Sequence, residues 1–350
     1  MNLSPQSPTY IFGTGSFGQD TAKILVEKGF DIRGFISNTE KSSEINQIKV
    51  YRWEEVHDLA NGQILVAVFN RNDALSLFIE QAKSCGAKHV FMPWDFFEYI
   101  EKNVNWCFWL KDKNFLTGYQ KHIDDVLPFL GDDKSRDCLS NVFKFRTGNF
   151  LNYSHFTHKE PQYFNNLTLD KRLGISGYLD IGAYHGENLL ELETYLPVHM
   201  AMLFEPDKKN FYELIQKENQ FTCQNIYPLN LGISNQNTFV SFNASGSESS
   251  GITTTGKTKI LCVKLDDVVP THEKIDFIKM DVEGAELSVL EGAESVIQTN
   301  KPTLAISLYH NWDDLWTIPI YVKDTHPGYD LFIRQHMNNS FDLVLYAVPR

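Results

Sequence analysis

The sequence predicts an α/β protein with two Rossmann-like units, the second of which ends in an antiparallel strand pair. Three observations predict this fold. Apolar strands at Thr9–Phe12 and Gly177–Ile181 are each followed by a glycine-rich turn and an amphipathic helix. Strands and helices then alternate, which is the order of a parallel sheet with helical crossovers. The short connection through Asn338–Asn339 forces the last two strands to pair antiparallel.

Length and composition favour a two-domain globular protein and exclude several classes. The 350 residues, 42% of them hydrophobic, exceed what one hydrophobic core usually organises. A net charge of −12 argues against a nucleic-acid partner, which needs a basic patch. No run approaches the ~20 apolar residues of a membrane-spanning helix, and Met1–Tyr10 lacks the features of a secretory signal. The five cysteines have no CxxC spacing, so we expect reduced thiols and a cytoplasmic protein.

Residues 1–95 are predicted to form a small Rossmann-like unit of the nucleotide-binding type. Its elements follow from apolar runs and from glycine and turn residues. In chain order they are the strand Thr9–Phe12, a helix capped by Gly29, the strands Ile32–Ile36 and Ile64–Phe69, a helix closing at Gly86, and the strand His89–Met92. Residues 96–173 are rich in aromatics at helical spacing, so we expect a helical connector whose aromatics pack in the core.

Residues 174–350 are predicted to form the second unit. The expected elements, in order, are the strand Gly177–Ile181, the helix Glu187–Tyr195, the strand Met200–Phe204, the helix Lys208–Glu218, the strands Ile226–Ile233, Asn235–Ala244, Lys257–Val263 and Phe277–Asp281, the helix Ala285–Ile297, the strand Thr303–Leu308, the helix Asp314–Val322, and the strands Tyr329–Ile333 and Phe341–Val348. The Ser-, Gly- and Thr-rich segment 245–256 is expected to be a mobile lid.

The turn Asp180-Ile181-Gly182-Ala183-Tyr184-His185-Gly186 is typical of a cofactor-binding loop. Gly182 and Gly186 allow a tight turn and close approach of a ligand to the backbone. Asp180 is expected to hold a ligand's ammonium or an ordered water. Glu205 follows the next strand, where an acidic side chain accepts hydrogen bonds from ribose hydroxyls. Acids at both positions fit a positively charged nucleoside such as S-adenosylmethionine, although an ordinary turn beside a surface glutamate is the simpler alternative.

Further motifs make residues 175–348 similar to a known family. They are Leu179–Ala183, Phe204–Pro206, Leu265–Val268, Ile278–Glu286, Leu308–His310 and Asp314–Pro319. These motifs resemble the FkbM family of S-adenosylmethionine-dependent methyltransferases. The resemblance implies a class I methyltransferase sheet and O-methylation of a sugar hydroxyl on a glycan, nucleotide-sugar or secondary metabolite, as in polysaccharide biosynthesis. The expected cofactor-binding residues are Asp180, Gly182, Ala183, Gly186, Glu205 and Asp281.

Methylation of a hydroxyl needs a base that removes the hydroxyl proton. His310 is the candidate, with Asp281 on the neighbouring strand as its carboxylate partner. A structural histidine or a hydrogen bond to the substrate are the alternatives for His310, Asp281 is the alternative base, and His185 is a weaker candidate.

An acidic cluster of Asp281, Glu283 and Glu286 follows the strand that ends at Asp281. We assign Glu286 mainly to the helix N-terminus, where a carboxylate complements the macrodipole. Three carboxylates suit Mg²⁺, but nothing in the sequence requires a metal, and none is predicted.

The N-terminal turn, Gly13 to Gly18, has the GxGxxG spacing of dinucleotide-binding folds. That fingerprint also needs an acid about twenty residues later, whereas the second strand here ends at Ser37-Asn38 and the next acid is Glu40. We therefore expect this unit to be structural or to present a substrate. The rival functions are an NAD(P)-linked sugar oxidoreductase and a non-catalytic binding scaffold. The expected partner is a small-molecule or glycan substrate, and a homo-oligomer stays open.

Overall fold

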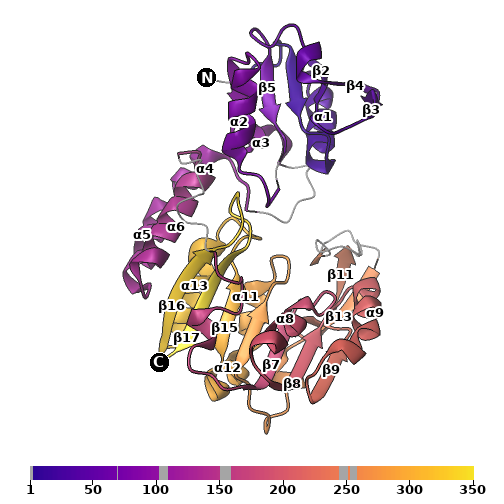
Figure 1. Cartoon of the computed structure of the whole chain (residues 1–350). Coiled ribbons are helices and arrows are strands. Elements are labelled where there is room, and N and C mark those ends of the chain that lie inside the picture. Colours follow the sequence, from indigo (N-terminus) through magenta and orange to yellow (C-terminus); the bar gives the residue numbers. More distant parts are fainter. Residues whose placement is uncertain (1–2, 69, 102–108, 150–158, 244–250, 253–257) are drawn as a thin grey trace.

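The computed structural model describes residues 3–68, 70–101, 109–149, 159–243, 251–252 and 258–350 (Figure 1). Its N-terminal sheet has the strand order β3-β4-β2-β1-β5-β6. The strands are β1 (Thr9–Phe12), β2 (Ile32–Ile36), β3 (Glu44–Ile45), β4 (Ile48–Tyr51), β5 (Gln63–Val66) and β6 (His89–Phe91). All pair in parallel except β3 with β4, a short hairpin that the apolar pattern did not predict. The helices are α1 (Ser16–Glu27), η1 (Trp53–Glu55), α2 (Leu75–Ser84) and α3 (Pro93–Ile100).

The described part of the segment between the N-terminal sheet and the C-terminal sheet is helical. Its elements are α4 (Lys113–Thr117), α5 (Gln120–Val126), η2 (Leu127–Phe129), α6 (Asp133–Arg146) and α7 (Asn166–Leu169). Buried aromatics join this segment to α3, since the rings of Trp94 and Trp109 lie edge-on to Phe145, with centroids 5.2 and 5.7 Å away. The predicted unit boundaries near residues 95 and 173 stay predictions.

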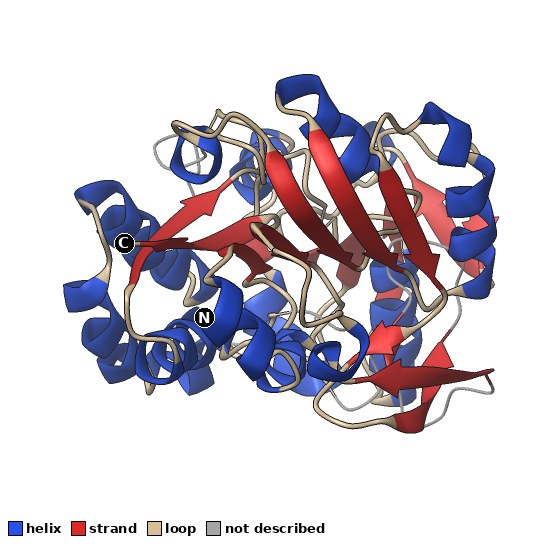
Figure 2. Cartoon of the chain, turned by 90° about the horizontal axis from the view of Figure 1, so that it is seen from below, coloured by secondary structure: helices blue, strands red, loops and turns tan. Residues whose placement is uncertain are grey.

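The C-terminal sheet has seven strands in the order β16-β17-β15-β14-β7-β8-β9. They are β7 (Ile175–Ile181), β8 (Val198–Phe204), β9 (Asn225–Leu229), β14 (Phe277–Met280), β15 (Thr303–Ser307), β16 (Tyr329–Gln335) and β17 (Leu343–Pro349). β17 runs antiparallel to both of its neighbours, so β16 is parallel to the other strands. Helices cover both faces of the sheet (Figure 2): α8 (Glu187–Tyr195), α9 (Lys208–Gln216), η3 (Glu218–Gln220), α10 (Leu265–Val268), α11 (Glu286–Glu291), α12 (Glu294–Asn300) and α13 (Asp314–Thr325). The predicted fold class is confirmed.

Two predicted elements are split. The strand expected at Ile226–Ile233 divides into β9 and β10 (Gly232–Ile233), and β10 joins a small sheet with β11 (Thr238–Asn243), β12 (Gly251–Ile252) and β13 (Thr258–Val263). The helix expected at Ala285–Ile297 breaks at Gly292, where an added Cβ would lie 2.0 Å from the carbonyl oxygen of Ser234. The predicted lid, residues 245–256, lies outside the described residues apart from β12.

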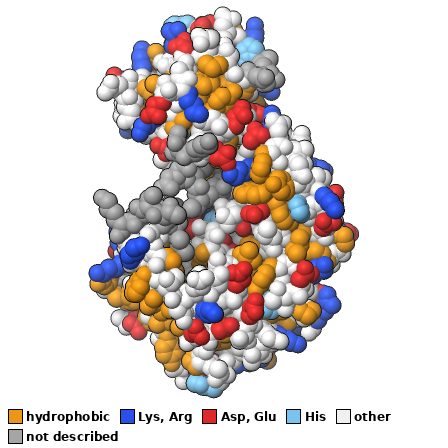
Figure 3. Space-filling view, turned by 180° about the vertical axis from the view of Figure 1, so that it is seen from behind, with side chains coloured by type: hydrophobic (Ala, Val, Ile, Leu, Met, Phe, Trp, Pro, Cys, Tyr) orange, Lys and Arg blue, Asp and Glu red, His pale blue; other side chains and the backbone are white. Residues whose placement is uncertain are grey.

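The loop after β5 docks on the turn between β16 and β17. The Asn339 amide is fully buried; its Nδ2 donates to the carbonyl oxygens of Asn70 and Asp73 at 2.6 and 2.7 Å, and its Oδ1 accepts from the Leu75 N–H at 3.0 Å. The N–H of Asn338 donates to the Arg71 carbonyl oxygen at 3.0 Å. Both segments follow the carboxyl ends of parallel strands, so these ends of the two sheets meet where the molecule narrows between its lobes (Figure 3).

No helix in the described ranges is long and apolar enough to cross a membrane.

Candidate active site

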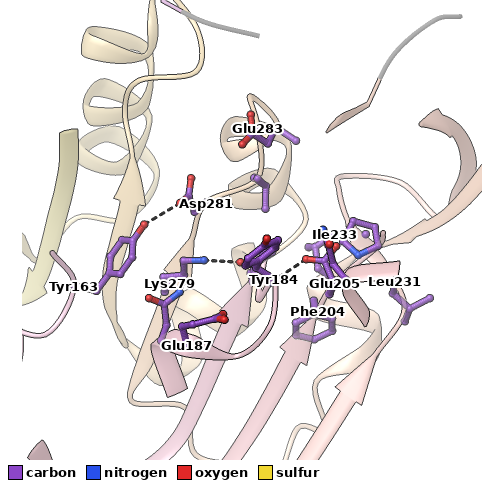
Figure 4. Close-up of a pocket in the computed structure, with 18 of the residues that line it drawn as sticks. Tyr163, Tyr184, Glu187, Phe204, Glu205, Leu231, Ile233, Lys279, Asp281 and Glu283 are labelled. Atoms are coloured by element: carbon purple, nitrogen blue, oxygen red, sulfur yellow. Dashed lines mark hydrogen bonds between the residues drawn. The ribbon is translucent and has the colours of Figure 1, made fainter. Parts of the chain in front are cut away.

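A cavity of about 330 Å³ lies at the carboxyl ends of β7, β8 and β14 (Figure 4). Polar lining residues come from the ends of these strands. Apolar lining residues come from the small sheet that contains β10, β11 and β13. The loop after β5 in the N-terminal unit adds Arg71. The lining residues include Arg71, Tyr163, Gly182, Tyr184, Glu187, Glu205, Leu231, Ile233, Phe242, Ile260, Lys279, Asp281, Glu283, Tyr309 and Asp342.

The glycines after β7 are required by close packing. Gly182 has φ +82°, and an added Cβ would lie 1.9 Å from the carbonyl oxygen of Asp281. Gly186 has the same φ, precedes α8, and would place a Cβ 2.6 Å from the Phe221 ring. Gly182 lines the cavity, while Ala183 is buried in the wall behind it. At Gly182 the turn therefore presents backbone to the cavity, whereas Tyr184 of the same turn lines it with a side chain (Figure 4).

Asp180 does not face the cavity, which corrects the prediction that it holds a ligand's ammonium. Its carboxylate is fully buried and lies 3.1 Å from the Nζ of Lys279, the residue opposite it in the register of β7 and β14. The same Nζ donates to the carbonyl oxygen of Gly182 at 2.6 Å. Burial raises the pKa of Asp180, against the opposing effect of Lys279. The ammonium beside Asp180 is thus that of Lys279. A lysine within the otherwise apolar strand Phe277–Met280 was the sequence feature that could have predicted this pair.

Glu205 lines the cavity from the end of β8. Its two oxygens accept the N–H groups of Tyr184 and Asp207 at 2.9 and 2.8 Å, which fixes the carboxylate in place. Burial raises the pKa of Glu205 to about 7. Since a carboxylate oxygen accepts more than one hydrogen bond, the group keeps acceptor capacity toward the cavity.

Asp281 follows β14 and faces the cavity. Tyr163 donates to its Oδ2 at 2.9 Å, and Tyr309 donates to its Oδ1 at 3.2 Å. Burial opposes ionisation, but Lys279, His310 and the Tyr163 hydroxyl outweigh it and hold the pKa of Asp281 below its ordinary value. Asp281 is therefore an ionised carboxylate at neutral pH. Tyr163 has no local sequence signal, and Tyr309 lies within the motif Leu308–His310 but was not predicted to line the cavity.

His310 lies behind Asp281, with 1% of its side chain exposed. Its Nδ1 is 2.7 Å from Oε1 of Glu286, and its Nε2 is 3.4 Å from Oδ1 of Asp281 and 3.8 Å from Oε2 of Glu283. Burial lowers the pKa of His310, but Glu286, Glu283 and Asp281 raise it well above its ordinary value. A protonated imidazole outside the cavity lining is not placed to take a proton from an acceptor, which corrects its predicted role as the base.

Two further ionisable residues, Glu283 and Arg71, line the cavity. Glu283 has φ +53°, and burial raises the pKa of its carboxyl to about 7. Arg71 lies 3.9 Å from Asp342, between Nη1 and Oδ2, and comes from the other unit. No sequence pattern marks Arg71, because its place at the cavity depends on the docking of two distant loops.

Packing accounts for the first and last glycines of the N-terminal turn, Gly13 and Gly18. A Cβ on Gly13 would lie 2.8 Å from the Ala67 carbonyl oxygen, and one on Gly18 would lie 2.2 Å from that of Gly13. After β2, the Asn38 amide bonds to the side chain of Gln81, with Nδ2 at 3.0 Å from Oε1. These contacts explain Gly13 and Gly18 but not Gly15, where an added Cβ would meet no described atom within 4 Å. The rejection of an NAD site stays a prediction.

Comparison with known proteins agrees with this architecture. Residues 180–341 match the profile of the methyltransferase FkbM domain. The chain is also similar to the crystal structure of a methyltransferase FkbM from Methylobacillus flagellatus KT, with 23% identity, a TM-score of 0.78, and coverage of 97% of this chain and 90% of that one. That likeness concerns the fold, and it includes the N-terminal unit. No curated protein matches the sequence significantly.

Proposed function

Because residues 180–341 match the methyltransferase FkbM domain, we propose that the protein transfers a methyl group from S-adenosylmethionine to a sugar hydroxyl. The acceptor would be a free sugar, a glycan or a nucleotide-linked sugar. The observation that carries the proposal is one cavity with two fixed carboxylates, Glu205 and Asp281, at the ends of the strands that flank β7. Carboxyl ends of parallel strands are where α/β sheets bind their ligands.

The residues at the β8 side fit this cofactor. Glu205, fixed by two backbone N–H groups, would accept the ribose hydroxyls. Leu231 and Ile233 lie beside it and offer an apolar surface for a purine (Figure 4). Gly182 presents backbone, with Ala183 and Gly186 shaping the same turn, and the acids Glu187 and Asp281 suit a cationic ligand. When bound, S-adenosylmethionine supplies an electrophilic methyl group.

Asp281 would receive the acceptor's proton, since it is ionised and faces the cavity. Tyr163 and Tyr309 hold Oδ2 and Oδ1 of the carboxylate, and the imidazole of His310, itself held by Glu286, lies 3.4 Å from Oδ1. His310 is thus a positioning residue in this proposal. Asp281→Asn keeps the shape of the side chain but accepts no proton, so turnover at saturating cofactor should fall by about 10²–10⁴.

Calorimetry with S-adenosylhomocysteine on the full chain tests the cofactor site. We expect saturable binding to the wild type and at least about tenfold weaker binding to Glu205→Gln, because hydrogen bonds to a charged acceptor contribute about 1.5–3 kcal/mol. Glu218→Gln, in the exposed η3, is the matched control. Absence of binding by the wild type would refute the proposal. Transfer of labelled methyl to a panel of sugars and nucleotide-sugars then identifies the acceptor.

A further inference from the structure

His310 and the neighbouring Glu286 each have one buried polar atom without a hydrogen-bond partner among the described residues. One ligand atom each from Asp281, Glu286 and His310 lies within 4.8 Å of the others, and the last two residues are buried. Nε2 of His310 and Oε2 of Glu286 make no hydrogen bond, although both side chains are at most 1% exposed. An unsatisfied buried polar atom costs about 1–3 kcal/mol, so a group that binds there would stabilise the cluster.

The imidazole is oriented as a metal ligand. Nδ1 is held at 2.7 Å by the Glu286 carboxylate, which fixes the tautomer with Nε2 as the lone-pair nitrogen when the ring is neutral. Ligating histidines in metal sites usually make such a contact with a carboxylate. Here Nε2 is directed at two carboxylates that line the cavity, Asp281 at 3.4 Å and Glu283 at 3.8 Å.

These separations suit a shared ion better than a hydrogen bond. An N–H···O bond has its donor and acceptor at about 2.7–3.2 Å, whereas two ligands at about 2.0–2.2 Å from one ion lie about 3–4 Å apart. Asp281 is prepared for the same task, because Tyr163 holds its Oδ2, while Oδ1 accepts from Tyr309 and lies 3.4 Å from the imidazole. Hydrogen-bonded carboxylates are the usual form of metal-ligating acids.

We propose that Asp281 and His310 bind a divalent metal ion at the cavity wall, with Glu283 as the nearest third ligand and Glu286 as the outer partner of the histidine. The ion would replace the proton on Nε2 of His310, and two carboxylates with the resulting neutral imidazole match the charge of such an ion. The mixed nitrogen and oxygen set favours Mn²⁺ or Zn²⁺ over Mg²⁺, since imidazole suits transition metals and Mg²⁺ prefers oxygen and water. The sequence alone did not require this ion.

Binding of the ion does not depend on the reaction, but its use in methyl transfer rests on the proposed function. Asp281 and Glu283 face the cavity, so the open positions of the ion would face the acceptor. A coordinated hydroxyl has a lowered pKa. The ion would therefore make the acceptor hydroxyl, whose proton Asp281 would receive, easier to deprotonate.

Titration of chelator-treated, full-length protein with MnCl₂ tests the site, with free Mn²⁺ followed by its paramagnetic resonance signal. We expect a saturable loss of that signal at one ion per chain. Glu283→Gln and His310→Gln should each weaken binding by about tenfold or more. His272→Gln makes the same substitution in a surface pair, where Nε2 lies 3.5 Å from Oε1 of Glu273, and should leave binding unchanged. ZnCl₂ and MgCl₂ in parallel titrations give the preference among ions.

The proposal is overturned if the wild type shows no saturable binding, or if Glu283→Gln binds Mn²⁺ as tightly as the wild type. Glu283 has a partly exposed side chain, so its variant keeps the test valid if the buried His310→Gln variant fails to fold. Calorimetry with S-adenosylhomocysteine on chelated and on manganese-loaded wild type separates the two proposals. If the protein binds the cofactor but no metal ion, only the metal site is rejected. If the manganese-loaded protein does not bind the cofactor, the proposed function is rejected.

Discussion

Replacing Lys279 with methionine should destabilise the C-terminal sheet, because it removes the ammonium but keeps most of the length of the side chain. The exposed fractions of the Lys279 and Asp180 side chains are 2% and 0%, and their charged atoms lie 3.1 Å apart. Removing one partner of a buried pair costs about 3–5 kcal/mol, since the other charge stays buried. The lost hydrogen bond to Gly182 adds about 1 kcal/mol. We expect the free energy of unfolding to fall by about 4–6 kcal/mol.

Urea unfolding followed by circular dichroism measures this loss. Lys274→Met is the matched control, because Lys274 is 65% exposed and its Nζ lies 3.8 Å from Asp276; surface pairs contribute about 0–1 kcal/mol. Adding Asp180→Asn to Lys279→Met should restore part of the stability, since a neutral amide then replaces the unpaired charge. A loss below about 1 kcal/mol, or a double variant no more stable than the single one, would refute the reasoning.

The pH dependence of the same variant gives a second measurement. Burial already raises the pKa of Asp180 above its ordinary 3.8, and removing Lys279 raises it further. The folded variant then binds a proton more tightly than the unfolded chain, so its stability falls as pH rises above about 4. We therefore expect the stability difference between wild type and Lys279→Met to shrink as pH is lowered from 7 toward 4.

Three further predictions concern the cavity and the contact between the units. Affinity for S-adenosylhomocysteine should increase from pH 6 to pH 8, because the pKa of Glu205 is about 7 and its ionised form is the better acceptor; in Glu205→Gln, calorimetry should show a flatter profile. Gly182→Ala should abolish this binding, because its Cβ would lie 1.9 Å from the Asp281 carbonyl oxygen at a φ of +82°; unchanged affinity would contradict the close approach. Asn339→Ala should leave buried backbone groups unsatisfied at about 1–3 kcal/mol each, and hydrogen exchange at the Leu75 N–H should become faster, whereas the exposed Asn61→Ala should not change it.

Local pattern predicted most of the C-terminal sheet, because its strands are buried apolar runs bounded by glycine or acidic residues. The helix Glu187–Tyr195 agrees in both bounds with α8. The sequence could not predict the break at Gly292, since it depends on the Ser234 carbonyl oxygen of a distant loop. The hairpin of β3 and β4 was missed because its strands have only two and four residues.

The strand ends were the best guide to the site. The positions of Glu205 and Asp281 follow from the carboxyl ends of their strands, and both line the cavity. Asp180 lies two residues before the equivalent position, which Gly182 occupies, and is buried opposite Lys279, a difference that depends on cross-strand register. Arg71 and Tyr163 reach the cavity through tertiary packing, which leaves no local pattern to find.

The place of β17 in the sheet has a consequence for folding during synthesis. This strand is the last in chain order, yet it lies between β15 and β16, and residues Leu343 to Ala347 are all fully buried. Until the ribosome releases these residues, β15 and β16 have no strand between them, and each exposes a row of unpaired backbone groups. Unpaired strand edges in partly folded chains promote association between chains. The nascent protein therefore passes through its most aggregation-prone state after nearly all of its hydrophobic core has been made.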